Sequence, residues 1–472
     1  MKKVGIILSS SLVTKELELD FGRITPSELP LGNKHLFHYQ EDYLGKYCDE
    51  VYVTQPIGHK TNLKTDKIVT VNADFSLLET ISYVLDLFEG SMVVILFGDT
   101  LVEHDLTMSI NQKRDIVFTH ENIEFSYDWT ETIERQIIIG LFIFINHFNV
   151  KESLNSSSKF GDFILSISEF SLFEKSFNWM DFGQKRTYSY NKIKYLETRG
   201  FNSISYSKGY VTKKSSDWFK MYAEYKWMHE VQYLSPEVFT PVVRDFNSNG
   251  DVSSYNIEYK DFISLSDKFI FGNFNIEGEL NILSSLINFL TIIKNQIPLI
   301  EVNDNFISNK LKLRFNELEA SFLKDFRLNE IYLQTHKYFE NKILKYGFFH
   351  GDICFSNVLY NNIDGVFYLL DPRGYLDRED GFSMRGPVNY DLYKLAHSFV
   401  CGYDKIIAFN EVVNIDDMRL RFQKFLNLTD LDSEELKFGL IQLFISMIPL
   451  HADHKVRQNC FAETVQIIWD NL

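Results

Sequence analysis

The most informative part of this sequence is the stretch Phe348–Tyr375, which reads FFHGDICFSNVLYNNIDGVFYLLDPRGY. It contains the triplet His350–Asp352 and, further on, Asn357. An apolar strand, Val366–Leu370, then leads directly into Asp371. These carboxylate and amide groups are predicted on short loops beside β-structure, where one carboxylate can orient a hydroxyl and the other oxygens can hold Mg²⁺. Such an arrangement suits phosphoryl transfer, whose catalysis is mainly positioning and charge neutralisation.

The order His-Gly-Asp, spaced Asn, hydrophobic strand and Asp resembles the aminoglycoside phosphotransferase and choline kinase group of small-molecule kinases. The resemblance implies that Asp352 is the catalytic base, that Asn357 is a metal ligand and that Asp371 is the main Mg²⁺ ligand. It gives His350 a role in shaping the loop. From the residues alone, an ordinary β-hairpin with Asp352 and Asn357 as turn formers is the alternative.

Length and charge set the broad class of the chain. Its 472 residues exceed one ordinary core, which predicts two domains, or three. A 45% apolar and 15% aromatic composition is typical of a globular protein. The net charge of −16 argues against nucleic acid as a partner, because proteins that bind it present basic surfaces. Nucleotide binding stays compatible with this charge, since it uses local cations and Mg²⁺.

The cysteines and the N-terminus predict a cytoplasmic location. The four cysteines form no CxxC or metal-binding spacing, as expected of a reduced protein. The first residues, MKKVGIILSSSLV, are interpreted as a buried strand rather than a signal peptide, because the apolar run is short and acidic residues follow it. No apolar run approaches the roughly 20 residues that span a bilayer, so no membrane insertion is expected.

The first half alternates strands with helices, which predicts an α/β domain with a mainly parallel sheet. In such sheets, ligands bind beyond the carboxyl ends of the strands. Asp99 follows the predicted strand Met92–Phe97 and is therefore expected at that end of the sheet. The predicted strands are Val4–Leu8, Glu50–Gln55, Ile68–Val71 and Met92–Phe97, and the predicted helices are Phe37–Tyr47 and Ser76–Phe88.

This half resembles the sugar-phosphate and choline-phosphate nucleotidyltransferases. Their signature of Gly-Arg, prolines and a lysine is matched in order by Gly22, Arg23, Pro26, Pro30 and Lys34. The resemblance implies that the arginine and the lysine bind a nucleotide, which would be CTP or another NTP.

Two aspartates extend the resemblance. Asp99 in LFGDTL and Asp181 in WMDFG match the family's metal-binding positions, so the resemblance implies an Mg²⁺ site between them. From the residues alone, each could equally be a turn or helix-capping residue. The stretch Ser9–Ser11 stands where the family has a glycine-rich turn that allows close backbone approach to the nucleotide. Nucleotide binding and activity of this half therefore stay open.

The domain boundary is predicted near residue 190, beside the basic, tyrosine-rich stretch 184–199. This gives a nucleotidyltransferase-like α/β domain over residues 1–190 and an α+β, bilobal, protein-kinase-like domain over residues 191–472. The small lobe is expected at about 195–262 and the large lobe at about 263–472.

In the kinase resemblance, one lysine of the second predicted strand contacts the phosphates of ATP. The strands are Phe201–Ser207 and Tyr210–Lys214, and the lysine is Lys213 or Lys214. Because neighbouring residues of a strand point to opposite faces, only one of them can serve, and the spacing slightly favours Lys214.

The helix predicted over Ser216–Tyr233 carries Glu224, the implied partner of that lysine, with Glu230 as the alternative. The run Tyr255–Tyr259 resembles the family's hinge strand, which implies that backbone groups around Glu258 bind the adenine. On the residues alone, these charges could also lie on solvated surfaces.

The rest of the second half is predicted to be largely helical. A long helical pattern covers Lys312–Tyr346, and Lys342–Gly347 is interpreted as the end of a core helix that enters the His-Gly-Asp loop. Asp391 is expected to brace this loop, as a similar aspartate does in the kinase relatives. Arg373 is expected either to contact the substrate or to form an ion pair.

The combined prediction is an ATP- and Mg²⁺-dependent kinase acting on a small alcohol, which is a sugar, a polyol or an amino alcohol. Nucleotidyl transfer onto the phosphorylated product could follow. The whole chain resembles bacterial proteins of capsule and surface-polysaccharide biosynthesis. The alternatives are a nucleotidyltransferase with an accessory kinase-like domain, and an inactive scaffold in a biosynthetic complex. The oligomeric state stays open, with a homo-oligomer among the options.

Overall fold

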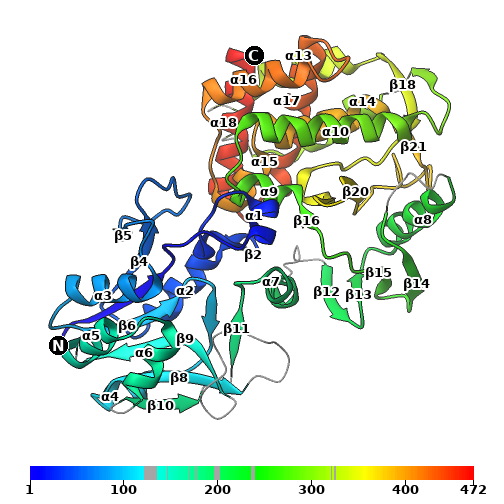
Figure 1. The fold of residues 1–472 in the computed structure, drawn as a ribbon. Coiled ribbons are helices and arrows are strands. Elements are labelled where there is room, and N and C mark those ends of the chain that lie inside the picture. The colour runs from blue at the N-terminus through cyan, green and yellow to red at the C-terminus, as the bar shows by residue number, and fades with distance from the viewer. Residues whose placement is uncertain are drawn as a thin grey trace. The chain divides into compact units, whose positions relative to one another are not determined.

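The chain forms two compact units in a computed structural model that describes residues 1–121, 136–145, 147–168, 171–175, 178–195, 202–234, 240–303, 305–319, 322–323 and 326–472. Unit 1 comprises Met1–Leu196 with Phe271–Asn273, and unit 2 comprises Glu197–Ile270 with Phe274–Leu472. Each unit has hydrophobic cores of its own, and each can be followed by colour in Figure 1.

Unit 1 is built on a seven-stranded sheet with the strand order β10-β8-β9-β6-β1-β4-β5. All neighbouring strands are parallel except that β9 is antiparallel to both β6 and β8. The sheet is therefore mainly parallel, as its sequence predicts. The strands are β1 (Lys3–Leu8), β4 (Glu50–Pro56), β5 (Ile68–Val71), β6 (Met92–Phe97), β8 (Ile116–Glu121), β9 (Gln136–Phe144) and β10 (Leu172–Lys175).

Both faces of this sheet are buried, which explains why its central strands β1 and β6 are almost continuous apolar runs. In β6, Val94 and Leu96 join the core on one face, while Val93 and Ile95 join the core on the other. The first face packs against helices α2 and α4, and the second against α3, α5 and α6. These helices are α2 (Leu36–Leu44), α3 (Leu77–Leu87), α4 (Thr107–Asn111), α5 (His147–Ser156) and α6 (Phe160–Ile167).

Short elements surround the carboxyl end of β6. Strands β7 (Thr100–Val102) and β11 (Trp179–Asp181) form an antiparallel pair in which Asp181 lies opposite Thr100. This pairing brings together two segments that are distant in the sequence. The remaining elements of unit 1 are α1 (Lys15–Phe21), η1 (Pro26–Glu28), β2 (Pro30–Leu31), β3 (Lys34–His35), α7 (Lys185–Lys192) and η2 (Ile193–Tyr195).

Unit 2 begins with a four-stranded antiparallel sheet in the order β12-β13-β15-β14, which α8 (Trp218–Leu234) covers. The inner face of α8 presents Met221, Trp227, Met228 and Val231, all fully buried. The sheet strands are β12 (Asn202–Ser207), β13 (Tyr210–Ser215), β14 (Val243–Ser248) and β15 (Ser253–Glu258).

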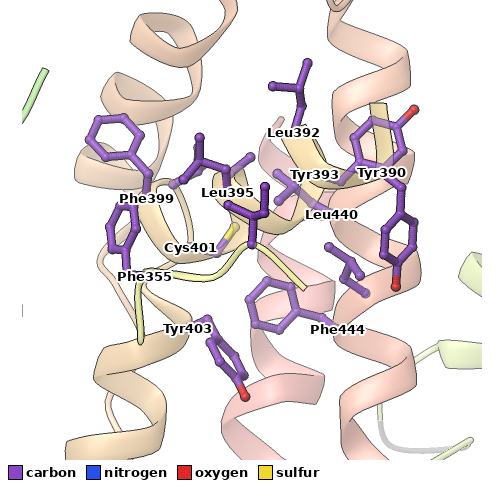
Figure 2. Close-up of a cluster of buried hydrophobic side chains, with 14 of the residues drawn as sticks. Phe355, Tyr390, Leu392, Tyr393, Leu395, Phe399, Cys401, Tyr403, Leu440 and Phe444 are labelled. Atoms are coloured by element: carbon purple, nitrogen blue, oxygen red, sulfur yellow. The ribbon is translucent and has the colours of Figure 1, made fainter. Parts of the chain in front are cut away.

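The larger part of unit 2 is mostly helical. Figure 2 shows its core, where Tyr390, Leu395 and Phe399 of α14 lie among other buried side chains that include Leu440 and Phe444 of α17. The helices are α9 (Leu265–Phe271), α10 (Ile276–Lys294), α11 (Phe306–Asn316), α13 (Leu328–Phe339), α14 (Val388–Phe399), α15 (Tyr403–Phe409), α16 (Ile415–Leu426), α17 (Ser433–Leu450) and α18 (Lys455–Asn471).

Two small sheets carry the loops of the His-Gly-Asp stretch. The prediction that Lys342–Gly347 ends a core helix is wrong, because Ile343–Phe348 is strand β18, paired on both sides. The first four residues of β18 alternate between exposed and buried, with Leu344 and Tyr346 buried. This two-residue period is the period of a strand. One sheet consists of β17 (Ile300–Asn303), β18 and β21 (Arg385–Pro387). The other consists of β16 (Ile263–Ser264), β19 (Val358–Asn361) and β20 (Val366–Leu369), and the short helix η3 (Phe355–Asn357) precedes β19.

Among the described helices, only α10 is long and apolar enough to cross a membrane by length and composition. The sequence alone suggested no such segment. Leu283, Leu286 and Leu290 of α10 are buried in the core of unit 2 at helical spacing, and a core position accounts for this composition equally well.

Candidate active site

A buried lysine joins three separate segments of unit 2. The ammonium of Lys213 on β13 lies 2.7 Å from Oε2 of Glu224 on α8 and 3.0 Å from Oδ1 of Asp371 after β20. The sequence spacing slightly favoured Lys214, but the lysine that lies between Glu224 and Asp371 is Lys213. Lys214 is exposed, since alternate residues of β13 face opposite sides and only the side of Lys213 is buried. Glu230, the alternative partner, is also exposed.

The ion pair between Lys213 and Glu224 is almost completely inaccessible to solvent. The side chains are 5% and 1% exposed. Burial alone would lower the pKa of Lys213, but the charges of Asp371 and Glu224 raise it above its ordinary value. Burial raises the pKa of Glu224, and Lys213 offsets this only in part. The hydroxyl of Tyr255 donates to the same Glu224 oxygen at 2.9 Å. Each of these groups therefore depends on the others for its place in the interior.

Asp371 occupies a constrained but accessible position. Its φ of 53° lies in the left-handed region, which costs a non-glycine residue about 1–2 kcal/mol. Burial opposes its ionisation, yet the ammonium of Lys213 holds the pKa of Asp371 below its ordinary value. The side chain remains 44% exposed, so it can reach a ligand. Close approach at Gly374, where a Cβ would lie 2.5 Å from the carbonyl oxygen of Ala223, sets this loop against α8.

The His-Gly-Asp loop is held from beneath by Asp391 of α14. Its carboxylate accepts the N–H groups of His350 at 2.9 Å and Gly351 at 2.7 Å. His350 is fully buried, which lowers its pKa to about 4 and keeps its ring neutral, and its Nδ1 accepts from the N–H of Asp352 at 3.3 Å. The indole N–H of Trp227 donates to the carbonyl of Phe349 at 2.9 Å. These bonds agree with the bracing role expected for Asp391.

Replacing Asp391 with Ala is expected to lower the free energy of unfolding by about 2–5 kcal/mol, because two buried N–H groups lose their acceptor. Urea unfolding of the variant measures this, with exposed Asp380→Ala as the control. Burial raises the pKa of Asp391 to about 7, so the folded wild type binds a proton that the unfolded chain releases below that pH. The free energy of unfolding of the wild type should therefore fall as the pH rises from about 4 to about 7. Over the same range, the free energies of unfolding of the wild type and of Asp391→Ala should become more similar. An unchanged unfolding midpoint would contradict the bracing role.

Asp352 itself pairs with a residue that the sequence did not single out. Lys394 of α14 places its ammonium 2.8 Å from Oδ1 of Asp352. Burial would lower the pKa of Lys394, but the Asp352 carboxylate raises it. Every residue of α14 except Asn389 is buried. The sequence of this helix, VNYDLYKLAHSF, contains several polar residues, so the need of Lys394 for a partner becomes clear only from its burial in the fold.

The amide of Asn357 has one end fixed and the other available. Its Nδ2 donates to the carbonyl oxygen of Asp352 at 2.9 Å, so Oδ1 is the end left for a ligand. Together with the carboxylate of Asp371 it would supply hard oxygen donors, which fit Mg²⁺. No cluster of three or more His, Cys, Asp or Glu side chains suited to a metal occurs in the described parts of the chain. A cation here would thus share its coordination with phosphate oxygens and water.

The expected adenine hinge is only partly available. The N–H of Glu258 donates to Val242 and that of Tyr259 donates to Gly209, both at 2.8 Å. The Glu258 carboxylate pairs with Lys260 at 2.8 Å. The N–H groups of Glu258 and Tyr259 therefore already form hydrogen bonds within the protein. Of the expected hinge donors, the N–H of Lys260 forms no hydrogen bond within the described residues.

Unit 1 holds a second pair of acidic groups, Asp99 after β6 and Asp181 in β11. A Cβ on Gly183 would lie 2.4 Å from Oδ2 of Asp99 and 3.2 Å from Oδ1 of Asp181, so both carboxylates converge on this glycine. Burial and the neighbouring charge of Asp181 raise the pKa of Asp99 to about 7. Two neighbouring carboxylates that converge in this way repel each other unless a proton or a cation lies between them.

Arg23 and Lys34, the other predicted nucleotide-binding residues of unit 1, are both exposed. Ser9 is buried, and its hydroxyl accepts the N–H of Ser27 at 3.0 Å. The residue in place of the glycine-rich turn thus ties β1 to the Pro26–Glu28 turn.

No protein-family model and no curated protein matches the sequence. Among solved structures, aminoglycoside phosphotransferase APH(4)-Ia is 11% identical with a TM-score of 0.41, over 58% of this chain and 92% of that chain. Choline kinase LicA from Streptococcus pneumoniae is 9% identical with a TM-score of 0.38, over 58% and 91%. Glucosamine kinase is 11% identical with a TM-score of 0.39, over 54% and 72%. These identities and TM-scores are low, so the function of this chain must be inferred from its own site.

Proposed function

We propose that unit 2 is a kinase that transfers the γ-phosphoryl group of ATP to a hydroxyl of a small molecule, in the presence of Mg²⁺. The observation that carries this proposal is the ammonium of Lys213, which bridges Glu224 and Asp371. Phosphoryl transfer requires a positioned cation for the phosphates beside a carboxylate that can ligate Mg²⁺. A sugar, a polyol or an amino alcohol remains the acceptor class proposed from the sequence.

Each residue of the site has a distinct part in this reaction. Asp352 orients the acceptor hydroxyl and accepts its proton as the bond to phosphorus forms. Lys213 steadies the phosphates of ATP, and Glu224 keeps the lysine in place. Asn357 and Asp371 would hold Mg²⁺, which supplies neutralisation of phosphate charge. Lys394, 2.8 Å from Asp352, fixes the carboxylate in the position from which it meets the hydroxyl.

An acceptor screen with ATP tests this proposal. Sugars, polyols and amino alcohols are offered to the purified chain, and ADP and phosphorylated product are measured together. Product formation with one acceptor class, abolished in Asp371→Ala, is the expected result. Full turnover in that variant would contradict the assignment of the metal ligand and of the reaction.

We infer a second activity for unit 1, transfer of a nucleotidyl group from CTP or another NTP. The convergence of Asp99 and Asp181 on Gly183 supports it, because two such carboxylates can hold the Mg²⁺ that this chemistry uses. Together the two units would phosphorylate an alcohol and then join its phosphate to a nucleotide. A product of this kind could supply surface-polysaccharide synthesis, the role suggested by the sequence resemblance.

Replacing Asp99 with Asn is expected to lower NTP-dependent pyrophosphate release by at least about 10²-fold, since the metal loses a charged ligand. Pyrophosphate is measured with CTP and UTP in the presence of phosphorylated alcohols. Asp66→Asn, a change at an exposed aspartate of unit 1, should leave the rate unchanged. Equal rates in both variants would show that the pair does not serve this reaction.

The scaffold alternative makes a different prediction. A chain that only assembles other enzymes would bind neither Mg-ATP nor Mg-CTP. Titration calorimetry with each nucleotide therefore separates the scaffold from the two enzymatic proposals, and saturable binding that Lys213→Met abolishes would exclude it for unit 2.

A further inference from the structure

A group of basic side chains surrounds the Asp352 end of the site in unit 2. Lys310 of α11 contacts the hydroxyl of Tyr390, and its ammonium lies 4.8 Å from the centre of that ring. The guanidinium of Arg373 stacks on Phe306, with its Cζ 5.3 Å from the ring centre. Electrostatic interactions connect Lys310 with Arg373, Lys394 and Asp352.

The backbone places Arg373 directly beside the His-Gly-Asp loop. Its N–H donates to the carbonyl of His350 at 2.7 Å. A Cβ on Gly351 would lie 2.7 Å from the Cβ of Arg373, so the arginine side chain leaves the backbone at the base of the loop that carries Asp352. Tyr390 is fully buried and interacts electrostatically with the same arginine and with Asp352. The basic group is therefore part of the reaction centre.

This group carries more positive than negative charge. Lys394 is paired with Asp352 at 2.8 Å. Among the residues that the structure describes, neither Lys310 nor Arg373 forms an ion pair. The Nη2 of Arg373 donates to the carbonyl of Leu376 at 3.2 Å, while its Nε is buried with no hydrogen-bond partner. Both side chains are half-buried, and two half-buried basic groups without a counter-charge point to an anion that arrives with a ligand.

We propose that the acceptor alcohol carries an anionic group, a carboxylate or a phosphate, and that Lys310 and Arg373 bind it while Asp352 meets its hydroxyl. This inference rests on the proposed kinase function. ATP is the less suitable anion, because its phosphates are served by Lys213 and by the metal ligands Asn357 and Asp371. The acceptor must lie on the Asp352 side, where the unpaired cations are. A guanidinium and an ammonium together suit the oxygens of a carboxylate or phosphate.

The electrostatics of Lys310 supports an anion that binds together with a proton. Burial lowers the pKa of Lys310 well below its ordinary value, and the charges of Arg373, Lys394 and Arg314 lower it further, while Asp352 acts in the opposite direction. Arg314 is itself paired with Glu317 at 2.8 Å. A bound anion would restore the ammonium form, so binding should take up a proton and should weaken as the pH rises.

Matched pairs of acceptors test the inference by turnover. Glycerol is compared with D-glycerate, glucose with glucuronate, and ribose with ribose 5-phosphate, and ethanolamine represents cationic alcohols. The anionic member of at least one pair should show a kcat/KM at least about tenfold higher, the fold-change expected of a single charge-assisted contact. Comparison of D-glycerate and glucuronate with ribose 5-phosphate then shows whether the site prefers a carboxylate or a phosphate.

The variant Lys310→Met should remove this preference. Its KM for the anionic acceptor is expected to rise about 10–100-fold, while its KM for ATP stays unchanged. Lys312→Met, at an exposed position of the same helix, is the matched control and should behave as the wild type. A preference for neutral or cationic acceptors with Asp352-dependent turnover would overturn the anionic class and leave the kinase intact. An equal rise in the KM for ATP would assign Lys310 to the nucleotide and also overturn the inference.

Binding measurements decide the case if no acceptor is turned over, an outcome that would count against the proposed kinase function. D-glycerate, glucuronate, ribose 5-phosphate and inorganic phosphate are titrated into the full chain by calorimetry, in two buffers of different ionisation enthalpy. Saturable binding with proton uptake, lost in Lys310→Met, supports the anion site independently of catalysis. Absence of binding by all four overturns the inference.

Discussion

The variant Asp352→Asn is expected to lower kcat for phosphoryl transfer by about 10²–10⁴-fold, the contribution of a positioned general base. Asparagine has the same shape but cannot accept the proton of the acceptor hydroxyl. The N–H of Asp352 and its carbonyl oxygen bond to His350 and Asn357 through the backbone, so these two contacts survive the change. The KM for ATP should therefore remain close to that of the wild type.

Two measurements accompany this variant. Removal of the carboxylate leaves the buried ammonium of Lys394 without its partner, so thermal unfolding must show that the chain still folds. Asp364→Asn, an exposed change in the turn between β19 and β20, should retain full kcat. Turnover of Asp352→Asn at the wild-type rate would remove Asp352 from the chemistry, whatever its effect on stability.

The second large effect is expected for Lys213→Met. Loss of this preorganised cation should lower kcat/KM for ATP by about 10²–10³-fold. It should also lower the free energy of unfolding by about 3–5 kcal/mol, because Glu224, 1% exposed, would be left as an uncompensated buried charge. Lys214→Met, one residue along the same strand, should change neither quantity, since Lys214 is exposed. Steady-state kinetics and urea unfolding of both variants measure these differences.

A double variant separates the loss of stability from the loss of function. Glu224→Gln added to Lys213→Met removes the unpaired charge and should recover most of the lost stability, but activity should stay low. If activity returned with stability, Lys213 would be a structural residue only. A larger effect of Lys214→Met than of Lys213→Met would show that the buried lysine is not the one that meets the phosphates.

Local sequence pattern was sufficient for much of the fold. The runs that became β1 and β6 were recognisable because both faces of their sheet are buried and these strands are almost entirely apolar. Helix α3 was similarly clear, since Ser76 and Glu79 form a capping box at its start. Motif order was sufficient to place a lysine of β13 beside Glu224, and Asn357 beside Asp352, but not to decide between Lys213 and Lys214.

The errors of the sequence interpretation concern tertiary context. Strand β18 was misread as helical because a short run such as ILKYGF fits either period, and only its pairing with β17 and β21 decides. The choice between Lys213 and Lys214 depends on which face of β13 packs on α8. Lys394 and Lys310 were missed because their relation to Asp352 spans distant segments, which no local pattern reports.

The close packing at Gly374 has an evolutionary consequence. Any side chain at this position would meet the carbonyl of Ala223, one residue before Glu224. A chain that acquired a larger residue here would have to move α8 outward, and the glutamate that holds Lys213 would move with it. Position 374 is therefore expected to remain glycine among homologues that keep a lysine at position 213, and to vary in those that have lost it.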